Sequence, residues 1–245
     1  MIDYDAYYRD QPGVDGERSS RWRELSAIGK ADHVTQLLAR AGRRAPGAVL
    51  EVGCGDGAVL AELGRRGLGP DLVGVEVSSS AAELAASRPE IDRVQTFDGV
   101  RLPFADASFE LVLATHVLEH VEDPLGLLRE MRRVASALVF VEVPLETNLA
   151  AQRPAAIARS VAAGHVQRFR RADVRQLLTQ SGLTLAGEIS DPLPRAVRTF
   201  TDGEVRGTLK WAVRSLLALS PAVGERLMTV HYAALGAISP PTLTG

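Results

Sequence analysis

The stretch Val49-Leu50-Glu51-Val52-Gly53-Cys54-Gly55-Asp56-Gly57 places an apolar run directly before a loop with glycine at every second position. An apolar segment compatible with a helix, residues 58–63, follows at once. Glycine suits such a loop because the chain must turn sharply and bring bare backbone against a ligand, which a Cβ atom would block. Strand, glycine turn and helix form the first unit of a doubly wound α/β fold, and the turn predicts a nucleotide-binding site.

Strands and helices alternate along the rest of the chain. Apolar runs predict strands at 48–52, 71–77, 94–97, 109–114, 137–143, 183–189 and 226–238. Helical patterns or caps predict helices at 21–41, 58–63, 81–87, 124–134, 148–163, 171–181 and 208–219. The segment 191–203 is expected to be a loop because it holds two prolines and a glycine. This alternation favours a mostly parallel, seven-stranded sheet with helices on both faces.

We expect one domain over the 245 residues, divided into three parts. An N-terminal helical cap (1–45) precedes a cofactor-binding core (46–190), and a C-terminal helix and last strand (191–245) complete it. A hydrophobic content of 46% and a charged content of 24% are those of an ordinary globular protein. The formal net charge of −2 argues against a dedicated nucleic-acid binder.

Further function classes are excluded by what the chain lacks. Cys54 is the single cysteine, and no group of His, Asp or Glu has the sequence spacing of metal ligands, so no metal site is expected. Neither a signal peptide nor an apolar run of about 18 residues is found, which predicts a cytoplasmic protein without a membrane span. Basic charge is almost all arginine and alanine is abundant, as in GC-rich bacterial genomes.

The glycine loop fits two templates. Read as Gly53-x-Gly55-x-x-Ala58, it satisfies the dinucleotide fingerprint. Read as Glu51-x-Gly53-x-Gly55-x-Gly57, it resembles motif I of class I S-adenosylmethionine-dependent methyltransferases. Both templates need an acidic residue at the end of the second strand to accept two ribose hydroxyls, and Glu76 stands there. Loop and Glu76 therefore indicate a ribose-bearing ligand without choosing between the two.

Segments after the third and fourth predicted strands make the choice. Phe97-Asp98-Gly99, Leu102-Pro103-Phe104 and Leu118-Glu119-His120-Val121-Glu122-Asp123-Pro124 follow in order. Together with motif I they resemble small-molecule class I methyltransferases of the ubiquinone-biosynthesis-like kind (methyltransferase type 11 superfamily). The likeness covers residues 48–190, and the chain departs from it only where Val134-Ala135-Ser136-Ala137 replaces a Leu-Lys-Pro-Gly-Gly turn.

The resemblance implies a Rossmann-like fold with an α-helical lid, S-adenosylmethionine as cofactor and S-adenosylhomocysteine as product. It also implies a small-molecule acceptor, methylated on oxygen, nitrogen or carbon, for which a bacterial secondary metabolite is a candidate. In this family an aspartate at the position of Asp98 accepts the adenine amino group. The implied cofactor-binding residues are Glu51, Gly53, Cys54, Gly55, Glu76, Val77, Asp98, Gly99, Thr115 and His116.

Methyl transfer needs a proton acceptor only when the nucleophile must lose a proton. The candidate catalytic residues are His116, which follows the fourth strand, and His165, because imidazole titrates near neutral pH. For both histidines a non-catalytic role is favoured over catalysis: packing or a helix start for His116, and a local hydrogen bond for His165. Cys54 more simply fills a variable loop position than acts as a nucleophile. Tyr4, Tyr7 and Tyr8 either close over the cofactor or anchor a terminal helix.

Two other functions stay open. An NAD-type oxidoreductase would offer a Tyr-x-x-x-Lys pair, but neither Lys30 nor Lys210 has a tyrosine at that spacing. A non-catalytic regulatory protein that binds S-adenosylmethionine would keep the fold and lose turnover, which the intact loop, Glu76 and Asp98 argue against. A homodimer is also compatible with the sequence.

Overall fold

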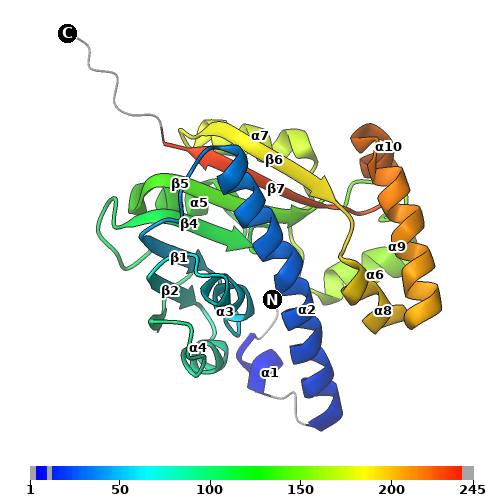
Figure 1. The fold of residues 1–245 in the computed structure, drawn as a ribbon, viewed down its shortest axis with the longest axis horizontal. Coiled ribbons are helices and arrows are strands. Elements are labelled where there is room, and N and C mark those ends of the chain that lie inside the picture. Colours follow the sequence, from blue (N-terminus) through cyan, green and yellow to red (C-terminus); the bar gives the residue numbers. More distant parts are fainter. Residues whose placement is uncertain (1–3, 10–12, 239–245) are drawn as a thin grey trace.

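The computed structural model describes residues 4–9 and 13–238, and its centre is one seven-stranded sheet (Figure 1). In spatial order the strands are β3 (Arg93–Thr96), β2 (Asp71–Glu76), β1 (Ala48–Val52), β4 (Phe109–Thr115), β5 (Ala135–Pro144), β7 (His231–Ala237) and β6 (Thr184–Asp191). Neighbours from β3 to β5 pair in parallel, and β7 alone runs antiparallel to both its neighbours. The predicted mostly parallel, Rossmann-like sheet is confirmed.

Helices connect and cover the strands. They are α1 (Tyr4–Arg9), α2 (Gly13–Arg40), α3 (Ala58–Arg65), α4 (Ser79–Ala86), a 3₁₀ turn (Leu118–His120), α5 (Pro124–Val134), α6 (Pro154–Ala162), α7 (Arg171–Gln180), α8 (Arg195–Asp202), α9 (Glu204–Ala218) and α10 (Pro221–Leu227). The long α2 lies along one face of the sheet, and the C-terminal α8, α9 and α10 gather beyond one end of it (Figure 1).

Side chains of β4 alternate between two apolar layers because successive residues of a strand point to opposite faces. Leu111 and Leu113 pack in a cluster with buried residues of α2 and α3. Val112 and Ala114 pack in a second cluster with buried residues of α5 and α7. Burial on both faces explains why this strand is an almost continuous apolar run.

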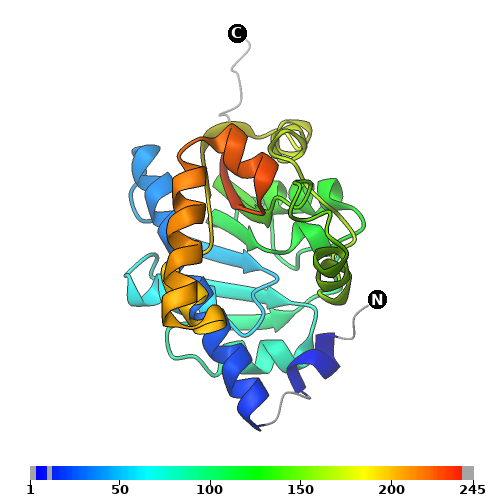
Figure 2. The same cartoon turned by 90° about the vertical axis from the view of Figure 1, so that its right-hand side faces the viewer.

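The carboxyl ends of the parallel strands meet at one edge of the sheet, which is where open α/β folds bind ligands. The glycine loop follows β1, Glu76 ends β2, and His116 follows β4 directly. Figure 2 shows these strands running side by side, with α2 and the C-terminal helices near them. The fold therefore brings the motif residues of the sequence to a common edge.

Two expectations about the C-terminal part are wrong. The segment 191–203 contains helix α8, because its prolines precede the helix and Gly203, with φ 83°, ends it. Val197 of that helix is buried, so packing overrides the turn-like composition. The predicted last strand begins later, at His231, since Pro221 at the first turn starts the additional helix α10.

Two helix starts also differ from the expectation. Helix α2 begins at Gly13 rather than Arg21, so it includes Gly13 and Gly16, which the sequence pattern places outside the helix. Pro154 does not interrupt a helix at 148–163 but occupies the first position of α6, where its missing N–H group leaves no bond unmade.

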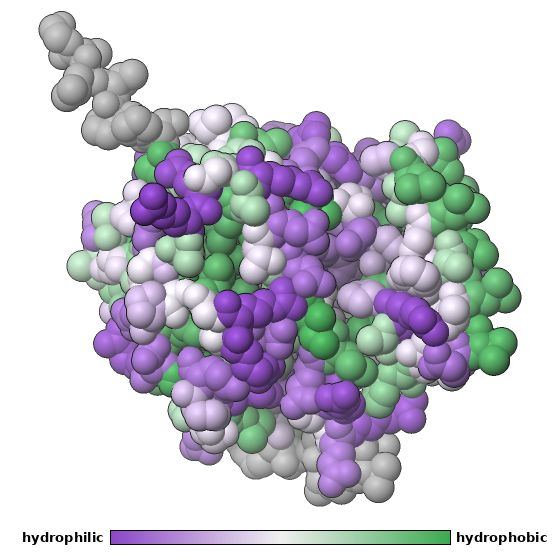
Figure 3. Space-filling view, viewed as in Figure 1, coloured by the Kyte–Doolittle hydropathy of each residue, from purple (hydrophilic) through white to green (hydrophobic). Residues whose placement is uncertain are grey.

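One side of α9 exposes large apolar side chains, visible as green over the C-terminal helices in Figure 3. The most exposed are Val205, Leu209, Leu216 and Leu219. None of the helices in the described ranges is long and apolar enough to cross a membrane.

Candidate active site

The loop after β1 depends on glycine for its shape. Gly53, Gly55 and Gly57 all have positive φ (67°, 55° and 76°), a region that side chains disfavour. A Cβ atom on Gly53 would lie 2.7 Å from Cγ2 of Val117. The backbone N–H groups of Gly53 and Cys54 donate to the carbonyl of Val75, at 2.8 and 3.1 Å, which fixes the loop against the end of β2.

The carboxylate of Glu76 is buried beside this loop. Its Oε2 accepts a hydrogen bond from the N–H of Gly55 at 2.8 Å. Its Oε1 accepts from the N–H groups of Val77 at 2.8 Å and Ser78 at 3.1 Å. Glu76 is thus held at the carboxyl end of β2 as the sequence predicts, in contact with the glycine loop, where it can face a ribose.

Glu51 and Thr115 meet under the loop. Oε1 of Glu51 accepts a hydrogen bond from the Thr115 hydroxyl at 3.0 Å, while Oε2 has no hydrogen-bond partner among the described residues. Burial raises the pKa of Glu51 to about 8, against the opposing charge of Lys30. An unsatisfied buried oxygen is costly, so a donor from a bound molecule would stabilise it.

Asp98 lies on the same edge, after β3. Its Oδ1 accepts hydrogen bonds from the N–H groups of Arg101 and Val100, both at 2.8 Å, and these bonds lower its pKa. The neighbouring Gly99 has φ 79°, and a Cβ there would lie 3.4 Å from Cγ1 of Val77. Asp98 is exposed and begins a tight turn. This turn lies next to Val77, the residue after Glu76.

The N-terminal segment reaches the loop through Tyr8. Its hydroxyl lies 2.7 Å from the position that a Cβ of Gly55 would take. Helix α1 is anchored by Asp5, whose Oδ1 accepts hydrogen bonds from the Ser78 hydroxyl at 2.7 Å and the Ser80 N–H at 3.1 Å. The side chains of Tyr4 and Tyr7 lie outside the described residues.

Cys54 packs in the interior and not against a base. Its thiol lies 2.7 Å from the position of a Cβ on Gly74, and burial followed by the charge of Glu51 raises its pKa well above the usual value. A buried thiol with a raised pKa is a poor nucleophile. The packing interpretation of Cys54 fits this geometry.

A second group of side chains surrounds Glu142, a buried carboxylate on β5. Its Oε2 lies 2.7 Å from Nδ1 of His33 on α2, and Nε2 of His33 lies 2.9 Å from Oδ2 of Asp191. Burial lowers the pKa of His33, but the hydrogen bonds to Asp191 and Glu142 outweigh it and raise the pKa to about 10. The raised pKa favours the protonated imidazolium form of His33, which lies between the carboxylates of Glu142 and Asp191.

His116 and His231 lie on the other side of Glu142. Nε2 of His116 is 3.2 Å from Nδ1 of His231, and Oε1 of Glu142 is 3.6 and 3.2 Å from these two nitrogens. Nδ1 of His116 is 3.0 Å from Oε1 of Glu119. Burial and Lys30 lower the pKa of His116, yet the Glu119 carboxylate raises it overall.

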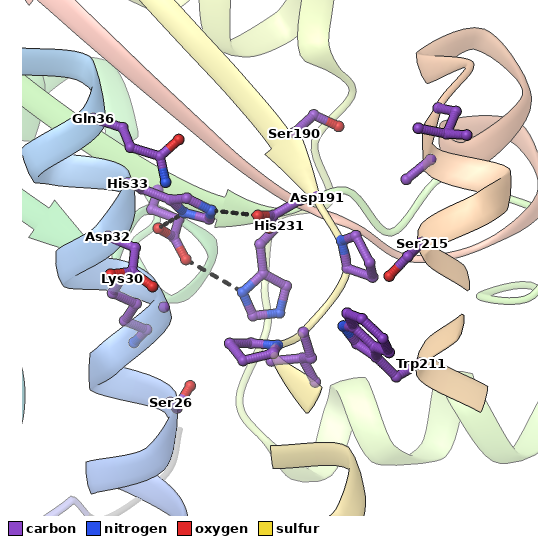
Figure 4. A pocket seen from close by; sticks show the side chains of 17 residues that line it. Ser26, Lys30, Asp32, His33, Gln36, Ser190, Asp191, Trp211, Ser215 and His231 are labelled. Atoms are coloured by element: carbon purple, nitrogen blue, oxygen red, sulfur yellow. Dashed lines mark hydrogen bonds and ion pairs between the residues drawn. The ribbon is translucent and has the colours of Figure 1, made fainter. Parts of the chain in front are cut away.

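Beside this cluster lies a cavity of about 390 Å³. It opens between α2, the end of β6 and α9, and His33 and His231 line it together with Lys30 and Trp211 (Figure 4). The apolar Trp211 face and the convergent polar groups are the usual combination in small-molecule sites.

His165 belongs to a neighbouring cluster and not to the cavity wall. Its Nδ1 is 2.8 Å from Oε2 of Glu146, and its ring meets that of His120 with centroids 4.9 Å apart. Nδ1 of His120 lies 3.3 Å from the carbonyl oxygen of Gly164. Glu119 connects the two clusters. It contacts His116, and one of its carboxylate oxygens lies within 4.8 Å of a ring nitrogen of His120 and of His165.

Sequence reasoning did not single out the residues of the Glu142 cluster and the cavity wall, namely His33, Glu142, Asp191 and Trp211. They come from elements far apart in the chain, so no local spacing signals them. One signal was available: Glu142 is a charge inside the apolar run 137–143, and buried charges are almost always paired.

The comparisons with known proteins identify the family of the chain. The family model described as a methyltransferase domain matches residues 21–187. The chain belongs to this methyltransferase family. Its cofactor is S-adenosylmethionine, and the glycine loop, Glu76 and the unsatisfied oxygen of Glu51 fit that group.

Individual curated relatives share between about a quarter and two fifths of their residues with this chain over the aligned part. An uncharacterized methyltransferase of Mycobacterium sp. (strain JLS) is 38% identical over 103 residues, 41% of this chain and 40% of that protein. The O-methyltransferase resE of Aspergillus sclerotiorum is 28% identical over 194 residues, covering 74% of this chain and 68% of the other. The alignment to the mycobacterial relative thus spans about two fifths of its length.

Solved structures share the fold. A SAM-dependent methyltransferase of Thermotoga maritima superposes with a TM-score of 0.63 at 17% identity, over 96% of this chain and 100% of that chain. At this identity the likeness concerns the architecture alone.

Proposed function

We propose that this chain transfers the methyl group of S-adenosylmethionine to an oxygen, nitrogen or carbon atom of a small molecule. The observation that carries the proposal is a shared edge. Gly53 of the glycine loop packs against Val117, the residue after His116, and Nε2 of His116 lies 3.2 Å from Nδ1 of His231, which lines the cavity. Cofactor and acceptor would therefore meet at the end of β4.

On the cofactor side each residue has a distinct task. The bare backbone of Gly53 and Gly55 would lie against the cofactor, and Glu76 would accept hydrogen bonds from the ribose hydroxyls. Asp98 would accept the adenine amino group. Thr115 and Glu51 would face the methionine end, where a cofactor donor satisfies the lone oxygen of Glu51.

When bound, the cofactor supplies an electrophilic methyl group on a sulfonium, so the chain has mainly to position the acceptor. Alignment of reacting atoms can lower a barrier by about 7–11 kcal/mol. His116 would take the proton of a hydroxyl or amine acceptor, with Glu119 holding its ring at 3.0 Å. His165, which lies in the neighbouring cluster, would act only for an acceptor that extends beyond the cavity.

The acceptor would occupy the cavity of about 390 Å³, a size suited to a small molecule. The name of the fungal relative, an O-methyltransferase, supports an oxygen acceptor. A bacterial secondary metabolite remains the candidate substrate that the family resemblance implies.

A substrate screen tests the proposal. The purified protein is incubated with S-adenosylmethionine and separate pools of phenols, alcohols, amines and carbon acids, and S-adenosylhomocysteine release and added methyl mass are followed by mass spectrometry. We expect release with at least one pool and much less with His116→Ala. Tight cofactor binding without release in any pool would favour the non-catalytic regulatory alternative.

A further inference from the structure

Three potential metal ligands converge beside the cavity. They are Nε2 of His116, Nδ1 of His231 and Oε1 of Glu142, separated by 3.2, 3.2 and 3.6 Å. Ligands around an ion with bonds of about 2.1 Å lie about 3.0 Å apart in octahedral and about 3.4 Å apart in tetrahedral coordination. The three atoms therefore form a triangle that one ion can cap with small shifts of the side chains.

The backbone positions of these ligands are well fixed. His116 follows the last residue of β4, Glu142 lies within β5, and His231 is the first residue of β7. The three strands are neighbours in the sheet, and Glu142 pairs with Ala233 on β7. Glu142 and His231 lie on strands, which hold ligands in a defined geometry better than loops do, and His116 directly follows a strand.

Further contacts orient two of the three ligands from behind. Nδ1 of His116 faces Oε1 of Glu119 at 3.0 Å, which leaves Nε2 directed at the cluster. Oε2 of Glu142 is held by His33 at 2.7 Å, which leaves Oε1 for the cluster. Metal-binding histidines usually donate their second ring N–H to a carboxylate or carbonyl, and the Glu119 carboxylate lies within ion-pair distance of that nitrogen of His116.

We infer that His116, His231 and Glu142 form a binding site for a divalent transition-metal ion at the wall of the cavity. Two imidazoles and one carboxylate suit Zn²⁺, Co²⁺, Mn²⁺ or Fe²⁺ and disfavour Ca²⁺ and Mg²⁺, which prefer oxygen ligands. The carboxylates of Glu142 and Glu119 attract the ion. Lys30, whose charge is felt at both histidines, and His33 oppose it.

The site gives the acceptor a chemical class. Three protein ligands leave coordination positions for water or for a substrate atom. Because Glu142 and His231 line the cavity, such a position can receive an oxygen of the acceptor, such as a hydroxyl, carboxylate or carbonyl. This assignment of the acceptor rests on the proposed methyl transfer, whereas the ion site itself does not. In the ion-bound protein His116 is a ligand and not the proton acceptor.

A competing site exists in the same region. Glu119, His120 and His165 also place ligand atoms within 4.8 Å of one another. None of these three residues lines the cavity. His165 is also already paired with Glu146 through Nδ1 at 2.8 Å. The first cluster is therefore favoured, and the second supplies a matched control.

Metal titration tests the inference. The full chain is stripped with a chelator and titrated with Co²⁺, followed by visible absorption, and with Zn²⁺, followed by calorimetry. We expect one ion per chain. His231→Ala should weaken Co²⁺ binding by about 100-fold or more, since losing even an outer partner of a metal ligand costs about 10–100-fold. Glu142→Gln should act in the same direction.

His165→Ala is the matched control, and its Co²⁺ affinity should stay within about twofold of the wild type. Circular dichroism and the affinity for S-adenosylhomocysteine are measured for every variant. If Glu142→Gln does not fold, His231→Ala alone decides. If S-adenosylhomocysteine binds to the wild type and to His231→Ala but no metal ion binds, the metal site fails while the methyltransferase assignment stands. If S-adenosylhomocysteine does not bind to the wild type, the methyltransferase assignment itself fails.

Three results would overturn the inference. The first is no saturable Co²⁺ or Zn²⁺ binding by the wild type. The second is equal affinity in the wild type and His231→Ala. The third is loss of binding in His165→Ala with retention in His231→Ala, which would place the ion in the second cluster.

Discussion

Two sides of the sheet edge are built in different ways: the side with the glycine loop and Glu76 (the proposed cofactor side) and the side with Glu142 (the proposed acceptor side). On the cofactor side, short stretches after β1, β2 and β3 carry the functional groups, and each acts close to its own motif. Glu76, for instance, bonds Gly55, Val77 and Ser78. On the acceptor side, Glu142 gathers histidines from α2, from the end of β4 and from β7. Backbone shape therefore dominates the first side, and long-range side-chain pairing dominates the second.

The largest effect is expected where backbone shape matters most. Gly53→Ala should lower the free energy of unfolding by about 2–4 kcal/mol, because it adds a residue with positive φ and a contact of 2.7 Å with Val117. Chemical denaturation measures the loss. The double variant with Val117→Ala should recover only the steric part. Full recovery would show that the positive φ costs nothing.

Loss of the Glu76 charge should come next. Glu76→Gln keeps the shape of the side chain but weakens charged hydrogen bonds, which contribute about 1.5–3 kcal/mol each. We expect the affinity for S-adenosylhomocysteine to fall by about 10–100-fold in calorimetry. Asp98→Asn, an exposed change on the same edge, is the comparison and should act less. Unchanged affinity in Glu76→Gln would remove Glu76 from the cofactor site.

A pH-dependent effect is expected from ionic pairing between β6 and α7, outside the cavity wall. Oε2 of Glu188 on β6 accepts hydrogen bonds from Arg175 at 2.8 Å and Tyr232 at 2.6 Å. Hydrogen bonding to Arg175, with further contributions from Tyr232 and Arg171, lowers the pKa of Glu188 from 4.5 to about 2. The ionised form therefore stabilises the fold above pH 4.5, and this contribution is lost as the pH falls toward 2.

Glu188→Gln should accordingly lower the free energy of unfolding at pH 7 by about 1–2 kcal/mol. The difference from the wild type should shrink between pH 4.5 and about 2. Denaturant melts at several pH values check both statements. A difference that stays constant across this range would mean that the charge of the Glu188 carboxylate does not stabilise the contact of β6 with α7 and β7.

The smallest effect is expected on the exposed face of α9. Leu216→Gln should change the free energy of unfolding by less than about 0.5 kcal/mol, because the side chain is 69% exposed. Thermal melting is sufficient to test this. If the free energy of unfolding falls by more than about 1 kcal/mol at equal protein concentration, this face of α9 is covered in solution.

These differences explain what the sequence could predict. Strand β1 and helix α5 have the predicted bounds, because an apolar run before glycines and an Asp-Pro start are strong local signals. Helix α8 was missed since its prolines precede it and the buried Val197 stabilises it through tertiary packing. The assignment of residues 1–245 to one domain and the homodimer stay predictions.

In the candidate site too, the part formed by local motifs could be predicted and the part formed by long-range contacts could not. Glu76 and the glycine loop meet as the motif requires, since their partners lie in adjacent strands. The surroundings of His116 could not be predicted, because Glu142 and His231 become its neighbours only when β5 and β7 pair. Local motifs therefore indicate the cofactor of the chain, whereas the proposed acceptor pocket emerges only from the tertiary structure.

Calorimetric titration of the wild-type chain tests the central claim most directly. Titration with S-adenosylhomocysteine should give saturable binding of one molecule per chain, and titration with NAD under the same conditions should give none. Saturable binding of NAD with no binding of S-adenosylhomocysteine would contradict the assignment of the glycine loop and of Glu76.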